Sequence, residues 1–163
     1  PNVKIVQGDA SKPEGLISEI KGIDVLVSAI YFDIPPSDLI NIAKEAGAKR
    51  IIIVGGAGSL LVAEGGPRLI DTPEFPEEYK ELASAGVKFY DELTPISDYD
   101  WTFFSPPAEI GPGPKTGKFR IGGDVLLTDE DGNSKISYDD YAVALVDELE
   151  NGKFLKKRFT AAY

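Results

Sequence analysis

The stretch Arg50-Ile51-Ile52-Ile53-Val54-Gly55-Gly56-Ala57-Gly58 places a run of β-branched residues directly before a cluster of glycines. Such a run favours a β-strand, and its lack of apolar–polar alternation indicates a strand that is buried on both faces of a sheet. The glycines predict a tight turn at the carboxyl end of that strand, where the absence of side chains lets a ligand approach the backbone. This stretch therefore predicts a central strand of a parallel α/β sheet.

Strand-like and helix-like segments alternate on both sides of this stretch, which indicates a mostly parallel, three-layer sheet with right-handed crossovers. We expect Ser37 and Ser137 to be the N-caps of two of the helices. Residues 108–135 are irregular and rich in Gly and Pro, so we expect a small lobe there, with a hairpin at Asp131-Gly132. We expect the whole chain, residues 1–163, to form a single domain. The expected strands are residues 3–6, 24–30, 50–54, 101–104 and 158–163, and the expected helices are residues 11–21, 37–46, 76–93 and the segment that follows Ser137.

The composition argues against two classes of partner. The formal net charge is −10, from 27 acidic and 17 basic residues, and this sign disfavours binding to the phosphate backbone of nucleic acids. Lys156-Lys157-Arg158 is too short a basic run to change that expectation. No apolar run approaches the roughly 20 residues that span a bilayer, and no signal peptide is visible. We therefore expect a soluble, cytoplasmic protein that binds neither nucleic acid nor membrane.

The chain contains no cysteine, histidine or methionine. Disulfides, thiolate or imidazole metal sites and histidine-dependent triads are therefore excluded. The acidic runs 74–81 and 129–131 are better explained as a solvated face and a turn than as a metal site. No tyrosine is followed four residues later by lysine, and Tyr79 is interpreted as a core-edge residue beside a solvated Lys80. The catalytic residues, if there are any, remain unassigned, and no metal is expected.

Small residues occur where three of the expected strands end. In parallel α/β sheets, ligands bind outside the carboxyl ends of the strands, at the point where the strand order reverses. Each of these segments also has a simpler explanation, because small residues permit tight turns whether or not a ligand binds. The three segments are Gly8-Asp9-Ala10, Ser28-Ala29-Ile30 and Gly55-Gly56-Ala57-Gly58-Ser59.

Two further segments belong with these three: Phe104-Ser105-Pro106-Pro107 and Ile136-Ser137-Tyr138-Asp139-Asp140-Tyr141-Ala142. The five segments, in their order along the chain, resemble the NAD(P)H-binding, NmrA-like branch of the atypical short-chain dehydrogenases. Members of that family have a Rossmann fold. The resemblance implies that NAD(P)H is the cofactor, with the choice between NAD and NADP left open. It implies a substrate lobe at residues 108–135. It also assigns the cofactor contacts: Gly8, Asp9 and Ala10 at the adenine, Ser28, Ala29 and Ile30 at the ribose and phosphates, Gly55 and Gly56 near the nicotinamide, and Ser105, Pro106 and Pro107 closing over it.

The sequence departs from that family at its start. Such proteins open with a strand, a G-x-x-G-x-x-G loop and a helix, whereas this chain begins at what resembles their third strand. Residues 56–61 do not replace the loop, because Leu61 occupies the position of the third glycine. We therefore expect a sheet that is truncated at its N-terminal side, with Val3–Val6 paired directly to Val25–Ala29. We also expect the cofactor binding to be weakened or lost.

Other readings stay open at this point. The sequence is also consistent with a non-enzymatic scaffold, either truncated or designed. It lacks cysteine, histidine and methionine, the glycine-rich loop and a Tyr-x-x-x-Lys pair. An exposed sheet edge would suit an interaction module or a homodimer. A fragment completed by a separate N-terminal unit is a further alternative. The substrate cannot be deduced from the sequence.

Overall fold

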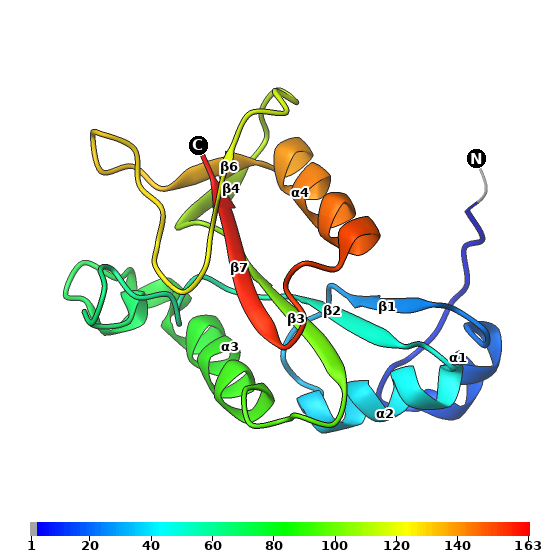
Figure 1. Ribbon diagram of the computed structural model, residues 1–163. Helices are drawn as coiled ribbons and strands as arrows, with labels where there is room; N and C mark the ends of the chain where they lie inside the picture. Colours follow the sequence, from blue (N-terminus) through cyan, green and yellow to red (C-terminus); the bar gives the residue numbers. More distant parts are fainter. Residues whose placement is uncertain (1–2) are drawn as a thin grey trace.

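The computed structural model describes residues 3–163 and shows a five-stranded, mostly parallel sheet between two layers of helices (Figure 1). The strand order is β1-β2-β3-β7-β5, and only β5 runs antiparallel to its neighbour. This arrangement confirms the predicted three-layer α/β fold. The strands of this sheet are β1 (Val25–Ser28), β2 (Arg50–Val54), β3 (Asp100–Ser105), β5 (Arg120–Gly122) and β7 (Lys157–Ala162).

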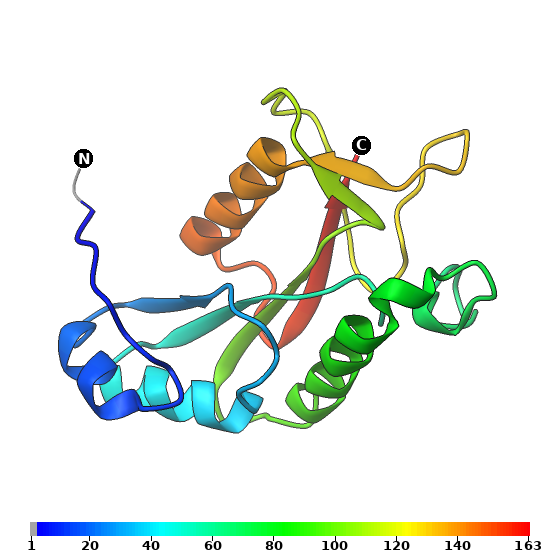
Figure 2. The same cartoon turned by 180° about the vertical axis from the view of Figure 1, so that it is seen from behind.

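Helices α1, α2 and α3 cover one face of the sheet and α4 covers the other, as both ribbon views show (Figures 1 and 2). Buried side chains of α2 and α3 form one core cluster with β2 and β3, and a second cluster joins α4 to β3 and β7. The helices are α1 (Pro13–Glu19), α2 (Pro36–Ala46), α3 (Lys80–Leu93) and α4 (Tyr138–Asn151), and the two 3₁₀ turns are η1 (Leu69–Asp71) and η2 (Glu77–Tyr79).

Strand β2 is the centre of this packing. Ile51 and Ile53 pack in the cluster formed with α2 and α3, and Ile52 is also fully buried. A parallel strand that is covered on both faces has no exposed side on which polar residues could alternate, which explains the unbroken apolar run. The prediction of a central buried strand is thus confirmed.

The register of the parallel strands brings their carboxyl ends to one edge of the sheet. Val25 on β1 pairs with Arg50 on β2, which in turn pairs with Asp100 on β3. As a consequence, the segments that follow β1, β2 and β3 leave the sheet at the same edge. These segments are the ones that form the candidate site.

The prediction that Val3–Val6 forms a strand paired with Val25–Ala29 is wrong. Residues 3–6 have no strand conformation, Val3 is 78% and Ile5 is 93% exposed, and β1 is the edge of the sheet. The segment runs past the β1 side of the sheet toward α1, and Lys4 makes an exposed ion pair with Glu19 of that helix (Figure 2). An alternating apolar pattern needs a neighbouring strand to supply its backbone hydrogen bonds, and these four residues have none in the structure.

The two predicted N-caps have different outcomes. Ser137 caps α4, because its Oγ accepts a hydrogen bond from the Asp140 amide at 3.0 Å. Ser37 does not cap α2, which begins one residue earlier at Pro36, with Pro35 in the cap position. Proline at the first helical position is already fixed in a helical φ and lacks an N–H that would need a partner, so the helix starts there.

The region 108–135 is irregular, as predicted, but contains short strands. β4 (Glu109–Gly111) pairs in parallel with β6 (Lys135–Ser137), and β5 extends the main sheet. At the predicted hairpin the chain does turn, with the Gly132 amide bonded to the Asp129 carbonyl at 3.1 Å, but the flanking residues do not form paired strands. Within residues 3–163, no helix is both long enough and apolar enough to cross a membrane.

Candidate functional site

A pocket of about 1110 Å³ opens at the carboxyl ends of β1, β2 and β3. Its floor is the turn that follows β2, and its walls come from the segments after β1 and β3, the loop before α3 and the first turns of α3. The lining residues are Ala29–Phe32, Val54–Gly58, Leu69, Thr72, Glu74–Pro76, Tyr79, Leu82, Ala83 and Pro106–Ile110. Most of these side chains are apolar or aromatic.

Gly55 and Gly56 have different structural roles in the floor. A Cβ atom on Gly55 would lie 2.3 Å from the ring of Phe103, so glycine is required there for β2 to pack against β3. A Cβ atom on Gly56 would meet nothing within 4 Å, which leaves the floor open toward the pocket. Among the hydrogen bonds of residues 3–163, none is donated by the amides of Gly56, Ala57 or Gly58. These amides are therefore potential donors to a ligand.

The rim of the pocket is aromatic and its charge is negative. Tyr31 is 71% exposed and Tyr79 is 58% exposed. The charged residues in the lining are Glu74 and Glu109, and no lysine or arginine is among them. A large apolar pocket at the carboxyl ends of parallel strands is the usual ligand site of such folds.

A family model described as NAD(P)H-binding matches residues 1–152 of this sequence. The chain belongs to the NAD(P)H-binding family. The protein YwnB of Bacillus subtilis is 45% identical over 124 residues, a match that spans 75% of this chain and 58% of YwnB.

Three solved structures superpose on it closely. A candidate exported protein from Burkholderia pseudomallei is 44% identical, with a TM-score of 0.90, over 100% of this chain and 82% of that one. A candidate epimerase from Bacteroides thetaiotaomicron is 38% identical, with a TM-score of 0.87, over 99% and 80%. A candidate NADH-flavin reductase from Streptococcus pneumoniae is 37% identical, with a TM-score of 0.84, over 98% and 80%. The Rossmann-like fold of this chain is thereby shown.

Several residues that the sequence suggested for cofactor binding lie together in the pocket. Ser28 and Ser105 instead lie buried at the strand ends, and the hydroxyl of Ser105 has no hydrogen-bond partner among residues 3–163. The predicted residues that line the pocket are Ala29, Ile30, Gly55, Gly56, Pro106 and Pro107.

Gly8, Asp9 and Ala10 are not part of the pocket lining. Asp9 instead forms the turn that leads into α1, where its Oδ1 accepts hydrogen bonds from the amide of Ser11 at 2.9 Å and from its hydroxyl at 2.6 Å. These bonds stabilise the carboxylate and lower the pKa of Asp9. Of the three strand-end segments, those after β1 and β2 contribute to the pocket lining, whereas the segment at Gly8 does not.

Sequence reasoning missed the wall formed by the loop before α3 and by α3 itself. Tyr79, interpreted as a core-edge residue, lies largely exposed at the rim, and Leu82, one turn on, is 46% exposed. The signal that could have revealed this wall is the long loop rich in Gly and Pro after β2, since loops at the carboxyl ends of strands carry ligand contacts.

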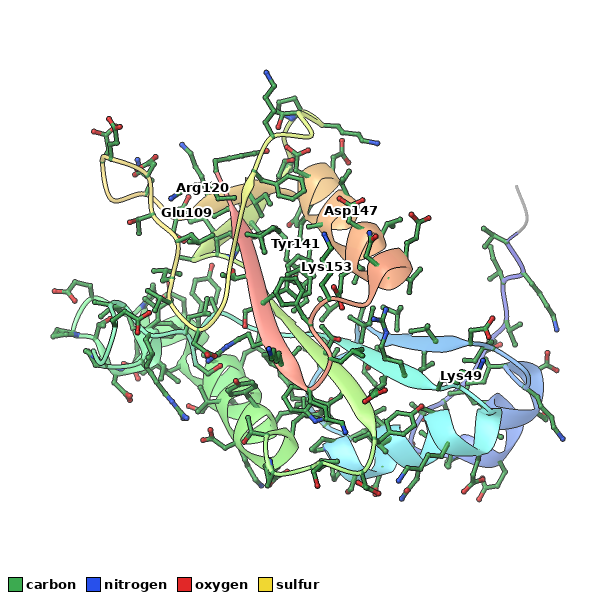
Figure 3. All side chains as sticks on the ribbon, in the orientation of Figure 1. Lys49, Glu109, Arg120, Tyr141, Asp147 and Lys153 are labelled. Carbon is green, nitrogen blue, oxygen red and sulfur yellow. The ribbon has the colours of Figure 1, made fainter. Side chains whose placement is uncertain are left out.

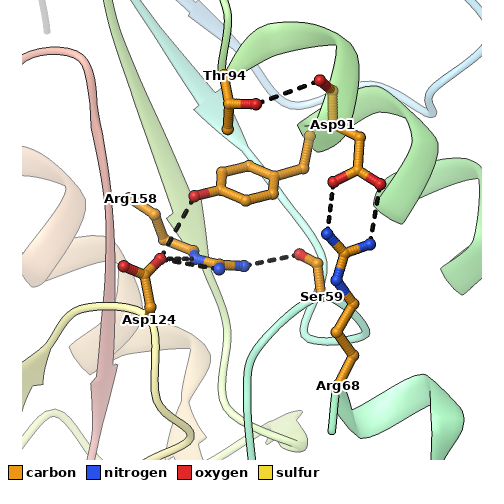
Figure 4. A network of polar contacts seen from close by, with 7 residues as sticks. Ser59, Arg68, Asp91, Thr94, Asp124 and Arg158 are labelled. Atoms are coloured by element: carbon orange, nitrogen blue, oxygen red, sulfur yellow. Dashed lines mark hydrogen bonds and ion pairs between the residues drawn. The ribbon is translucent and has the colours of Figure 1, made fainter. Parts of the chain in front are cut away.

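Behind the floor, a polar network fixes the turn after β2 to its neighbours (Figure 4). Arg158 of β7 donates to the Ser59 hydroxyl at 2.7 Å and to Asp124 Oδ1 at 2.9 and 3.0 Å. Its guanidinium lies 4.1 Å from the ring centroid of Tyr90, and burial raises the pKa of Tyr90. The network therefore connects the glycine turn with β7, α3 and the lobe.

A second polar cluster connects the lobe with α4. The carboxylate of Asp140 accepts hydrogen bonds from the amides of Thr116 and Gly117, from the Thr116 hydroxyl and from the Tyr163 hydroxyl. Burial acts to raise the pKa of Asp140, but these bonds outweigh it and lower the pKa to about 2. Asp140 thus remains a carboxylate that orders residues 116–117.

Proposed function

We propose that this NAD(P)H-binding chain is an oxidoreductase-type domain whose pocket receives the nicotinamide end of the cofactor together with a flat, conjugated acceptor. The observation that carries the proposal is the apolar pocket of about 1110 Å³ at the carboxyl ends of β1, β2 and β3. The likeness to a candidate NADH-flavin reductase at 37% identity supports an acceptor of this kind.

The floor of the pocket suits the nicotinamide end of the cofactor. Gly56 leaves open space, and the amides of Gly56, Ala57 and Gly58 are available to bond a carboxamide oxygen or an acceptor carbonyl. Pro106 and Pro107 form an apolar wall against which a flat ring can pack. A bound, reduced nicotinamide supplies a hydride.

The pocket requires no dedicated acid for such a reaction. A conjugated acceptor that takes up a hydride also takes up one proton, which bulk water can supply at an exposed rim. Tyr31, 71% exposed, leaves that rim accessible to solvent. This is consistent with the absence of a Tyr-x-x-x-Lys pair from the sequence.

The pocket lining offers few groups that could bind the phosphates of the dinucleotide. Its charged lining residues are Glu74 and Glu109, whereas phosphates are usually held by backbone amides at a helix N-terminus or by cations. We infer that NAD(P)H binds weakly to the chain of residues 1–163.

Isothermal titration calorimetry with NADH and NADPH tests the cofactor proposal. We expect saturable heat with a Kd on the order of 1 mM, well above that of an intact phosphate site. Calorimetry is preferable to tryptophan fluorescence, because Trp101, 3% exposed, lies near the amino end of β3, opposite the pocket. Gly56→Leu should abolish the heat by filling the floor, whereas Gly15→Leu, at a position in α1 with no neighbours, should not. No saturable heat for the unaltered chain would end the cofactor proposal.

A second candidate function is an interaction module or homodimer that uses the edge of the sheet. β1 is one of the two edge strands of the main sheet, and Val27 on it is 38% exposed. An unpaired strand edge is a template for pairing with another chain. Sedimentation velocity at increasing concentration tests it: a dimer that Val27→Lys disrupts supports the module, and a monomer at all concentrations argues against it.

A further inference from the structure

We propose that the pocket discriminates by charge and accepts a flat aromatic acceptor only weakly when that acceptor carries a negative charge near its ring. This inference rests on the proposed function, because it concerns the acceptor that the same pocket receives. It adds the substrate class, an uncharged conjugated ring system, and it names the two residues that determine the selection.

The two residues are Glu74, in the loop before α3, and Glu109, at the start of β4 (Figure 3 labels Glu109). They reach the pocket from different segments of the chain, and both are exposed. Glutamates are negatively charged at neutral pH. An acceptor in the pocket therefore contacts a lining whose only formal charges are negative.

The charges of these glutamates are not neutralised by neighbours. Neither glutamate takes part in any ion pair or side-chain hydrogen bond found among residues 3–163. Lys80, near the rim, is paired with Glu77 at 2.6 Å. Lys135 is opposite Glu109 in the β4–β6 register, but it forms no ion pair with Glu109 and does not line the pocket. The net charge of −10 adds repulsion of the same sign.

The uncharged part of the lining determines which ligand shape and polarity the pocket favours. Gly55–Gly58 make a flat floor, Pro106 and Pro107 an apolar wall, and Tyr31 and Tyr79 an aromatic rim. These surfaces favour a planar apolar ring system, which aromatic side chains contact well. The apolar walls also reduce the dielectric screening around the two carboxylates, so a ligand anion is repelled more strongly than it would be in bulk water.

The size of the effect follows from Coulomb's law. In water, two like charges about 4 Å apart repel by about 1 kcal/mol, which corresponds to about fivefold in affinity. Since both glutamates are exposed, added salt should screen the effect, because the Debye length falls to about 3 Å at 1 M ionic strength.

The test compares lumiflavin with its N3-carboxymethyl derivative, which places one carboxylate next to the same ring. Fluorescence titrations at low salt with the unaltered chain should give a dissociation constant about fivefold higher for the anionic ligand. The double variant Glu74→Gln, Glu109→Gln should bring the ratio close to one, and 1 M NaCl should do the same for the unaltered chain. The control double variant Glu14→Gln, Glu150→Gln changes the net charge equally at exposed positions outside the pocket, and it should keep the ratio.

The outcomes separate this inference from the function on which it rests. If neither flavin binds, or if both bind equally well to Gly56→Leu, the pocket is not an acceptor site and the proposed function fails. If both bind the unaltered chain with equal affinity, the acceptor site stands and the charge selection is refuted. A ratio that the control variant removes as completely as the pocket variant would also refute it, because the cause would then be net charge alone.

Discussion

Arg158 joins three parts of the molecule through a single guanidinium group. Its side chain is 4% exposed, and it donates to Ser59 behind the glycine turn and to Asp124 in the lobe. We expect Arg158→Met to lower the free energy of unfolding by about 2 kcal/mol, because it removes charge-assisted hydrogen bonds and the contact with the Tyr90 ring. Urea denaturation measures this loss.

Arg68 provides the matched control for that prediction. Arg68 also forms a two-pronged pair with a carboxylate, that of Asp91, but the two side chains are 34% and 49% exposed. Solvent screens such a pair, so Arg68→Met should cost less than about 1 kcal/mol. Equal losses of unfolding free energy in the two variants would show that the burial of Arg158 does not increase its contribution to stability.

Asp140 makes the stability of the fold depend on pH. Its pKa is lowered to about 2 in the folded state, whereas an unfolded aspartate titrates near its ordinary value of 3.8. Because the folded pKa is the lower one, the stabilisation is fully present above about pH 5 and is lost as the pH falls from about 4 to 2. Asp140→Asn should flatten this part of the curve of melting temperature against pH, and the exposed Asp139→Asn should leave it unchanged. If the melting temperature fell equally between about pH 4 and pH 2 in both variants, Asp140 would not be the group responsible.

Single residues also show where sequence reasoning reaches its limit. Gly55 and Gly56 were predicted as ligand-facing from their place after a strand, but only the position of the Phe103 ring shows that the first is required for packing. Asp9 follows a strand-like pattern as well, yet its carboxylate bonds the backbone of Ser11. A local pattern indicates that a small or polar residue is needed, whereas the three-dimensional neighbours decide why.

The turn after β2 is the element on which both packing and the pocket depend. Gly55→Ala would place a methyl group 2.3 Å from the buried Phe103 ring, so we expect a loss of about 2 kcal/mol in unfolding free energy. Gly56→Ala points into open space and should change stability by less than about 0.5 kcal/mol. Neither glycine has a positive φ, so backbone strain does not confuse the comparison. Chemical denaturation of the pair tests it, and a Gly55→Ala variant as stable as Gly56→Ala would be incompatible with this close packing.

The cap of α4 and the strongly apolar strand β2 were predictable from their own residues, whereas features that depend on which distant segment lies alongside were not. The start of α4 follows from Ser137, because a cap involves only residues three apart. The strand expected at Val3–Val6 did not form, because a strand depends on a neighbour that its own residues cannot specify. Likewise, the long loop rich in Gly and Pro after β2 indicates that a ligand contact is near, but the place of Tyr79 in the pocket wall arises from the packing of α3 against the sheet.

At the scale of the whole molecule, the sheet is held between two layers that make few direct contacts with each other. Arg50 of β2 is the link between the sheet and the carboxyl end of α4. Its guanidinium bonds the backbone carbonyls of Glu148 and Leu149 at 2.9 and 3.0 Å, and it is 3.3 Å from the Glu148 carboxylate. That carboxylate in turn accepts hydrogen bonds from the amides of Lys153 and Phe154, which begin the connection to β7.

The Arg50–Glu148 pair is almost completely buried, with side chains 8% and 2% exposed. Removing one partner should therefore affect stability differently from removing both. Arg50→Met leaves a buried carboxylate without its cation and removes one hydrogen bond from each of the Glu148 and Leu149 carbonyls, so we expect a loss of about 3 to 5 kcal/mol. The double variant Arg50→Met, Glu148→Met removes the uncompensated charge and should be more stable than Arg50→Met alone, although the amides of Lys153 and Phe154 then lose their acceptor. Urea denaturation of the four members of this double-mutant cycle measures the coupling. A double variant that loses the sum of the two single losses would show that the two residues act independently.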